Sequence, residues 1–203
     1  MASDSDSEVV ALERASLGVA RALVGPLSLR VSAGARLAIT GPNGSGKSLL
    51  LKAIAGQATL FSGRLRRAPG LTLMLLAQES ARREPWPLSG HDWFAAMGVV
   101  PPALPRLAAL LPRRLDTLSG GQWQLLRLAA ALSPPPGGEG RAPHLVMLDE
   151  PANHLDHAVK EAAVELMTAL DPGVTLLMTG HDSGMIEACG ATALPLEACL
   201  DAA

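Results

Sequence analysis

Hydrophobic residues recur along this chain with two different periods. Between residues 27 and 32 they alternate with polar residues: Leu27, Leu29 and Val31 are separated by Ser28, Arg30 and Ser32. This alternation predicts a half-buried strand in an N-terminal antiparallel layer. Continuous apolar runs, typical of strands buried on both faces, occupy residues 36–40, 71–77, 145–148 and 174–178. These runs predict the strands of a parallel sheet.

Apolar residues at helical spacing follow several of these runs. Helices are expected at residues 48–55, around 125–132 and around 159–170, the last as a crossover between parallel strands. Alternating strands and helices predict an α/β fold, with a mostly parallel core sheet flanked by helices. No internal repeat is seen, so one such unit is expected.

Domain boundaries are predicted from composition. Residues 1–8 are polar and acidic, and are expected to be disordered; a single domain is expected over 9–200. Residues 79–117 are rich in Pro, Arg and Trp and carry no strand pattern. With the helix that follows, they predict a small helical subdomain over about 79–132, inserted in the core. The Pro- and Gly-rich segment 133–140 is predicted to be a loop.

Composition excludes several classes of protein. The 203 residues carry a formal net charge of −2, which gives no electrostatic case for nucleic-acid binding. No apolar stretch approaches the roughly 20 residues of a membrane helix, so no direct membrane insertion is expected. The start of the chain does not resemble a secretory signal. Two cysteines, Cys189 and Cys199, lack metal-ligand spacing and are predicted to be free thiols.

The strongest chemical signal is a phosphate-binding loop of the G-x-x-x-x-G-K-[ST] type between a predicted strand and a predicted helix. Its residues are Gly41, Pro42, Asn43, Gly44, Ser45, Gly46, Lys47 and Ser48. The glycines let backbone N–H groups turn inward around phosphate oxygens, and Lys47 offers a positive charge to the outer phosphates. The Ser48 hydroxyl can ligate magnesium. The loop predicts a site for a nucleoside triphosphate.

Two carboxylate residues directly follow the apolar run that ends at Leu148. Asp149 is predicted to hold magnesium through water, as carboxylates at such strand ends do in P-loop enzymes. Glu150 is then free to orient or deprotonate an attacking water. Without the phosphate-binding loop, the same pair would indicate only a solvated strand end.

A second helix start also exposes backbone donors. Ser119 is a predicted N-cap, and Gly120, Gly121 and Gln122 follow it. One triphosphate cannot easily use two such termini of one chain, so this one is predicted to serve a nucleotide held by a second subunit. The alternative is an ordinary capped helix.

These motifs, in this order with Gln78 and His181, resemble the ATP-binding subunits of ATP-binding cassette (ABC) transporters, from about Leu12 to Leu196. The resemblance implies a P-loop ATPase fold of the ABC type and the cofactors ATP and Mg2+. It implies catalytic roles for Lys47, Glu150 and His181, the last beside the γ-phosphate. It also implies magnesium contacts at Ser48, Gln78 and Asp149, with Gln78 coupled to the membrane partner. Nucleotide contacts are implied for residues 41–48, Gln78 and, in the opposing subunit, Ser119, Gly120, Gly121 and Gln122.

Partners follow from the same resemblance. It implies a second cassette, expected as a homodimer, and a transmembrane permease, with the chain peripheral on the cytoplasmic face of the cell membrane. Residues 122–124 and 87–98 look like segments of metal- and cobalamin-uptake ATPases. Trp86, between two prolines, is the predicted contact for the permease; Trp93 and Phe94 are either part of that surface or a small satellite core.

Two alternatives stay open at this point. Residues 153–156 match a sequence motif typical of the soluble F-subfamily of ABC proteins, which acts on ribosomes. Members of that subfamily normally carry a second cassette and a charged linker, and both are missing here. A non-hydrolysing cassette is disfavoured by intact Lys47, Asp149, Glu150 and His181. One departure concerns the nucleobase: the family's adenine-stacking aromatic is replaced near Val19 by an aliphatic stretch, 16–20. Weak ATP affinity and poor selectivity against GTP are therefore expected.

Overall fold

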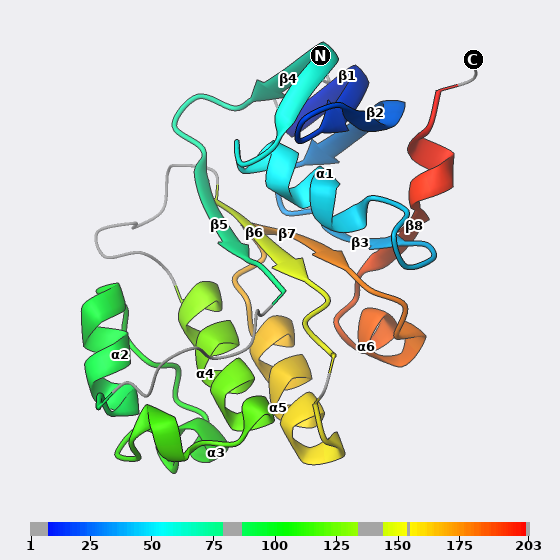
Figure 1. Cartoon of the computed structure of the whole chain (residues 1–203). Coiled ribbons are helices and arrows are strands. Elements are labelled where there is room, and N and C mark those ends of the chain that lie inside the picture. The colour runs from blue at the N-terminus through cyan, green and yellow to red at the C-terminus, as the bar shows by residue number, and fades with distance from the viewer. Residues whose placement is uncertain (1–7, 79–86, 134–143, 154, 202–203) are drawn as a thin grey trace.

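The computed structural model describes residues 8–78, 87–133, 144–153 and 155–201. Its secondary structure is divided between two sheets and the helices around them (Figure 1). The smaller sheet is antiparallel, with strand order β2–β1–β4. Its strands are β1 (Glu8–Gly18), β2 (Ala22–Ser32) and β4 (Thr59–Arg67).

The larger sheet has five parallel strands in the order β5–β6–β7–β3–β8. In chain order the strands are β3 (Arg36–Thr40), β5 (Thr72–Leu76), β6 (His144–Asp149), β7 (Val174–Thr179) and β8 (Thr192–Pro195). Helices connect most of them: α1 (Lys47–Ile54), α2 (Gly90–Met97), α3 (Pro105–Ala108), α4 (Gly120–Leu132), α5 (His157–Thr168) and α6 (Ser183–Ala188). Two short 3₁₀ helices, Leu115–Thr117 and Leu196–Cys199, complete the described elements.

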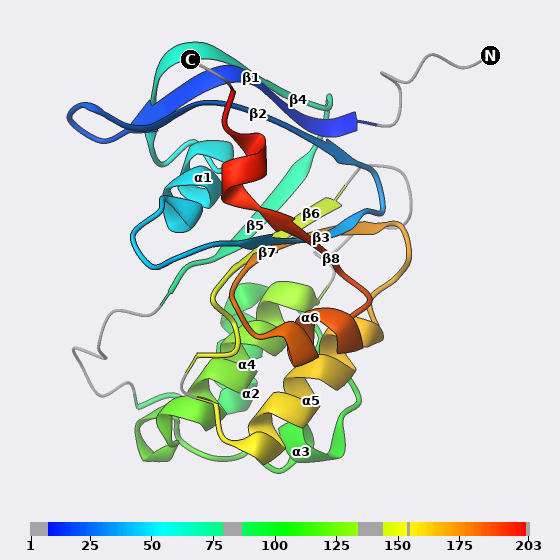
Figure 2. The ribbon, with the colours of Figure 1, turned by 90° about the vertical axis from the view of Figure 1, so that its right-hand side faces the viewer.

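The elements stack in layers. In both views α1 lies between the antiparallel sheet and the parallel sheet, while α2 to α6 lie on the opposite side of the parallel sheet (Figures 1 and 2). Each face of the parallel sheet therefore has its own apolar core. On β6, Leu145 and Met147 belong to the core shared with α1 and the antiparallel sheet, whereas Val146 and Leu148 belong to the core formed with the other helices. Burial on both faces explains the continuous apolar run.

The helical part of the chain shares that second core. Phe94 on α2 is 1% exposed. The ring of Trp93 meets Trp123 of α4 edge-on, with 5.0 Å between ring centroids. Of the two possibilities for this pair of aromatics, packing in the core is therefore the one the structure shows. Trp86, the predicted permease contact, lies outside the described residues.

Most predicted elements appear within one residue of their expected bounds. The alternation over 27–32 is confirmed in β2, where Leu27, Leu29 and Val31 are buried and their polar neighbours exposed. One correction concerns the predicted disordered terminus 1–8, because Glu8 is already part of β1 and pairs with Ser32. Its carboxylate accepts a hydrogen bond from Arg30 at 2.7 Å, which favours the strand. Residues 1–7, and most of the predicted loop at 133–140, lie outside the described residues.

No helix within the described parts of the chain is long and apolar enough to cross a membrane.

Candidate functional site

Parallel pairing brings four segments of the chain to one edge of the sheet. Gln78 follows β5, Glu150 follows β6, His181 follows β7 and the loop 41–46 follows β3, and these four strands are neighbours in the sheet. Because the carboxyl ends of parallel strands meet at the same edge, ligands of such folds bind there. The topology thus assembles the predicted site.

The phosphate-binding loop has the conformation that its glycines allow. Gly46 is the N-cap of α1 with φ +106°, and a Cβ atom there would lie 2.2 Å from Val24 Cγ2. Gly44 has φ +78° and nothing within 4 Å of where a Cβ atom would be, so that side of the loop is open. Ser45 Oγ is buried without a hydrogen-bond partner. An open loop, an unsatisfied hydroxyl and a helix N-terminus fit an anionic ligand such as a phosphate chain.

Lys47 places its charge inside this loop. The side chain is 5% exposed, and Nζ donates hydrogen bonds to the carbonyl oxygens of Gly41 and Pro42, both at 2.8 Å. An ammonium group has three donors, so one remains for a phosphate oxygen. The loop therefore holds the lysine that the sequence assigned to the outer phosphates.

A chain of hydrogen bonds joins the loop to the two carboxylate residues. Ser48 Oγ donates to Asp149 Oδ1 at 2.9 Å, and Thr179 Oγ1 donates to the same oxygen at 2.7 Å. The Thr179 hydroxyl in turn accepts the backbone N–H of Glu150 at 3.0 Å. Asp149 and Thr179 are in register on β6 and β7 and both are buried. One threonine thus links both predicted acidic groups.

Glu150 has an unusual backbone conformation. Its φ of +51° lies in the left-handed region, which costs a residue with a Cβ atom about 1–2 kcal/mol. Such conformations persist where the surroundings hold them, and they cluster at functional sites. Besides the bond to Thr179, the carboxylate Oε2 accepts from Gln78 Nε2 at 3.2 Å and from Asn153 Nδ2. Gln78 is itself steadied by Arg127 of α4, which donates to the carbonyl of Ala77 at 3.1 Å.

His181 is exposed and lines a small cavity of about 160 Å³ together with Glu150, Asn153 and Thr179. The next residue, Asp182, is the N-cap of α6 and accepts from Met185 N–H at 2.9 Å. Lys160 of α5 forms an ion pair with Asp182 and holds the pKa of that carboxyl below its usual range. The segment that carries His181 is therefore fixed at its α6 end, and His181 lines the same cavity as Glu150, the predicted base.

The second predicted terminus is not part of this assembly. Ser119 caps α4 in a capping box: its hydroxyl accepts from Gln122 N–H at 3.2 Å, and Gln122 Oε1 accepts from Ser119 N–H at 3.1 Å. Ser119 and Gly120 are exposed, and nothing lies within 4 Å of a Cβ atom built on Gly120. Both views show α4 and α1 on opposite sides of the parallel sheet (Figures 1 and 2). This chain alone does not bring the two termini to one ligand.

The residues also fit a hard cation. Ser48 and Asp149 offer oxygen atoms next to the loop, the donor type that magnesium prefers. Gln78 uses its amide nitrogen in the bond to Glu150, so its amide oxygen is a further candidate. No cluster of three or more His, Cys, Asp or Glu side chains suited to a metal occurs among the described residues. Magnesium held here would thus need phosphate oxygens or water to complete its coordination.

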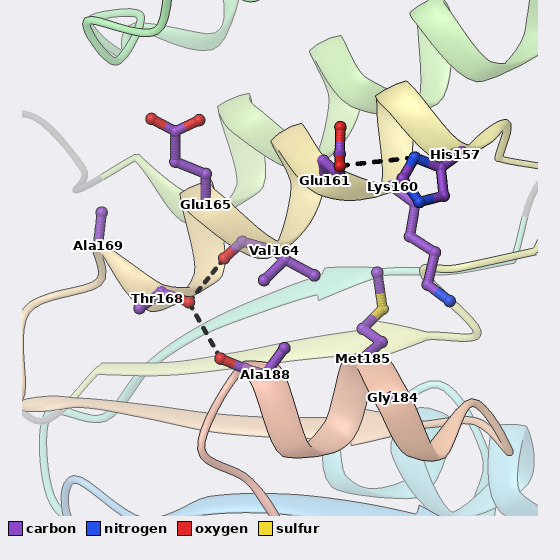
Figure 3. A pocket seen from close by; sticks show the side chains of 10 residues that line it. All are labelled: His157, Lys160, Glu161, Val164, Glu165, Thr168, Ala169, Gly184, Met185 and Ala188. Atoms are coloured by element: carbon purple, nitrogen blue, oxygen red, sulfur yellow. Dashed lines mark hydrogen bonds and ion pairs between the residues drawn. The ribbon is translucent and has the colours of Figure 1, made fainter.

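A groove among the described residues lies away from this edge of the sheet. It occupies about 640 Å³ between α5 and α6, and its lining includes Val164, Thr168 and Met185 (Figure 3). The Thr168 hydroxyl is bonded to the carbonyls of Val164 and Ala188, which satisfies it within the groove wall. None of the predicted site residues lines this groove.

Sequence reasoning did not single out two residues of the site. In the sequence, Thr179 only follows an apolar run. The feature that could have pointed to it is a hydroxyl group at the last position of a buried strand, two residues before His181. Asn153 stood within the matched loop without a role of its own. Both are recognisable only from the hydrogen bonds they make in the fold.

Comparison with known proteins gives this geometry a family. Residues 24–88 match the family described as "ABC transporter". The chain is 34% identical over 193 residues to a protein of Ruegeria pomeroyi named "Zinc import ATP-binding protein ZnuC", covering 90% of this chain and 73% of that one. It is also 34% identical over 178 residues to "Vitamin B12 import ATP-binding protein BtuD" of Escherichia coli, covering 78% and 71% of the two chains.

Solved structures agree on the fold. A protein from Pyrococcus furiosus described as "Putative ABC transporter (ATP-binding protein)" superposes with a TM-score of 0.72 at 18% identity, covering 95% of this chain and 99% of that one. At that identity the likeness shows the fold, and the fold is that of the ABC ATPases. Together with the relatives above, this likeness shows that the chain belongs to the ABC transporter family and is one of its ATP-binding ATPases.

Proposed function

We propose that this chain hydrolyses ATP at the carboxyl edge of its parallel sheet, with Glu150 as the base that orients or deprotonates the attacking water. The observation that carries the proposal is the chain of hydrogen bonds from Ser48 through Asp149 and Thr179 to Glu150. It joins the phosphate-binding loop to the backbone N–H of Glu150, a residue that is held in a costly backbone conformation. A solvated strand end has no need of such support.

The described residues divide the work in phosphoryl transfer. The N–H groups of the loop and Lys47 neutralise charge on the outer phosphates, and they are oriented before the ligand arrives. Ser48 and Asp149, with the Gln78 amide oxygen, would hold magnesium, which supplies further charge neutralisation when bound. Glu150 receives the proton of the attacking water, and His181 steadies the γ-phosphate across the shared cavity.

A second copy of the chain completes the site in this proposal. Ser119, Gly120, Gly121 and Gln122 form the N-terminus of α4, where Ser119 and Gly120 are exposed and which lies away from the phosphate-binding loop of the same chain. A helix N-terminus with open space beside a glycine, here Gly120, suits a phosphate, so the terminus of one copy would cover the nucleotide of the other. Two ATP molecules would then be enclosed between two cassettes.

The relatives support a cellular role in transport. Proteins named for zinc import and for vitamin B12 import are 34% identical to this chain, which supports the uptake of a metal or a cofactor through a separate transmembrane permease. The chain would then act at the cytoplasmic face of the membrane. The alternative role on the ribosome rests only on the F-subfamily motif at residues 153–156.

Glu150→Gln tests the chemistry. The amide keeps the shape of the side chain but cannot take a proton, so turnover should fall by about 10²–10⁴-fold while ATP binding persists. The variant should accumulate as an ATP-bound dimer in size-exclusion chromatography with MgATP. The matched control is Lys47→Ala, which should weaken the binding of a fluorescent ATP analogue and give no dimer. Turnover of Glu150→Gln at the parent rate would exclude Glu150 as the base.

The partner is tested by affinity purification from native membranes in detergent. Recovery of an integral membrane protein with the tagged chain is the expected result. Recovery of ribosomes without any integral membrane protein would instead favour the F-subfamily role.

A further inference from the structure

Asn153 contacts Glu150 at two points. Its backbone N–H donates to the Glu150 carbonyl at 3.1 Å, and its side-chain amide donates to Glu150 Oε2. The side chain is half-buried and forms part of the wall of the cavity that Glu150 and His181 share. Asn153 is therefore fixed to the main chain and to the carboxylate of the same residue.

The two amide donors at this carboxylate converge on one oxygen. Gln78 Nε2 and Asn153 Nδ2 both donate to Oε2, and no hydrogen bond to Oε1 is seen from any described residue. A carboxylate oxygen has two lone-pair directions, so two donors occupy Oε2. Oε1 is then the oxygen left to accept a hydrogen bond from water.

We infer that Asn153 is a positioning residue for ATP hydrolysis, which fixes the Glu150 carboxylate so that Oε1 faces the attacking water. The inference rests on the proposed role of Glu150 as the base. The Glu150 side chain needs such support because the residue lies beyond the last residue of β6, with φ +51°, where strand pairing no longer restrains it. Misplacement of a reacting group by about 1 Å can cost on the order of 100-fold in rate.

The loop that carries Asn153 is anchored at its other end as well. Asp156 caps α5 and accepts from Val159 N–H at 2.8 Å, so the segment from Glu150 to Asp156 is held by hydrogen bonds at both ends. Asn153 lies between these anchors, and its amide group can therefore keep a constant position relative to the carboxylate. The Glu150 carboxylate is therefore held by Asn153, from the loop that joins β6 to α5, and by Gln78, from the end of the neighbouring strand β5.

Two substitutions of Asn153 test the inference in the purified full chain. Asn153→Asp keeps the shape but replaces the donor by a second acceptor, and Asn153→Leu keeps the branching at Cγ and the number of side-chain heavy atoms without polar atoms. For both we expect kcat to fall about 10- to 100-fold. The Kd for a fluorescent ATP analogue should stay within about twofold, since no contact with the phosphate-binding loop is lost. The matched control is Gln57→Glu, an amide-to-acid change at an exposed position beyond α1, which should leave both constants unchanged.

The discriminating measurement is the double variant with Glu150→Gln. If Asn153 acts through the Glu150 carboxylate, adding Asn153→Leu to Glu150→Gln should change the residual rate by less than about twofold. A parent-like kcat in both Asn153 variants overturns the inference, and so does a loss in the Glu150→Gln background as large as in the parent. If Glu150→Gln itself turns over normally, the proposed base is wrong, which is a separate outcome.

Discussion

At the scale of single residues, Thr179 shows how one side chain organises two others. It is fully buried, donates to the carboxylate of Asp149 and accepts from the backbone of Glu150. A valine of the same shape would leave both partners without this bond, and a buried polar group left unpaired costs about 1–3 kcal/mol. The geometry of the two acidic residues thus depends on a residue with no catalytic chemistry of its own.

We propose that Val19 lies at the nucleobase end of the site. Val19 follows β1 directly and is 70% exposed, and the neighbouring strand β2 contacts the phosphate-binding loop through Val24 and Gly46. An aliphatic side chain there offers a base little more than apolar contact. The parent should therefore bind ATP and GTP with similar, weak affinity.

Val19→Tyr should tighten the binding of ATP by about tenfold. Stacking of a base on an aromatic ring contributes on the order of 1–3 kcal/mol, and about 1.4 kcal/mol corresponds to a factor of ten in Kd. Isothermal titration calorimetry with ATP measures the change. The control is Val100→Tyr at another highly exposed valine, 81% exposed and beyond α2. Equal tightening in both variants, or none in Val19→Tyr, would contradict the assignment of this position.

At the scale of elements, helix ends are held by arginines from strands. Arg36, the first residue of β3, donates to the carbonyls of Leu170 and Cys189, both at 3.1 Å, just beyond α5 and at the C-cap of α6. Arg67, at the end of β4, donates to Ile54 at the end of α1 at 2.9 Å. Carbonyls at helix C-termini lack partners within the helix and carry partial negative charge, so a guanidinium satisfies both needs.

Arg36→Met should lower the free energy of unfolding by about 1–3 kcal/mol, because two carbonyls lose charged donors while the apolar stem is retained. Urea denaturation followed by circular dichroism measures the change. Arg64→Met, an exposed change on β4, is the control and should stay within about 0.5 kcal/mol of the parent. A loss of the same size in both variants would refute a specific role for Arg36.

At the scale of the whole molecule, the parallel sheet separates two cores, and each contains one cysteine. Cys189 belongs to the core with α2 to α6, and Cys199 to the core with α1 and the antiparallel sheet. Both are free thiols, 1% and 5% exposed. Burial raises the pKa of Cys189 to about 11 and raises that of Cys199 above its ordinary value.

Both thiols should therefore resist alkylation until the fold opens. The thiolate is the reactive form, and a pKa of about 11 leaves roughly a thousandth of Cys189 ionised at pH 8. Iodoacetamide labelling at pH 8, read by mass spectrometry, should be at least about tenfold slower in the native protein than in urea. If the two cores unfold together, both cysteines should become reactive at the same urea concentration. Rapid stoichiometric labelling of the native protein would contradict the buried positions.

The sequence by itself determined the elements and the kinds of chemistry. The continuous apolar runs, the alternation over 27–32 and the loop 41–48 follow local rules of burial and backbone geometry, and these elements appear where they were predicted. The same local rules placed a lysine and a serine at the start of a helix, and two carboxylates at the end of a strand. Trp93 and Phe94 were ambiguous because an aromatic at helical spacing can face a core or a partner equally well.

Only the tertiary structure decided how these residues act on one another. Strand order brought Gln78, Glu150 and His181 to one edge, and the register of β6 with β7 aligned Asp149 with Thr179. The convergence of two amides on one oxygen of Glu150 depends on a hydrogen-bond partner 72 residues away in sequence. Hydrogen bonds extend only about 3 Å, so which polar groups meet is fixed by the packing of whole elements and not by the local sequence pattern.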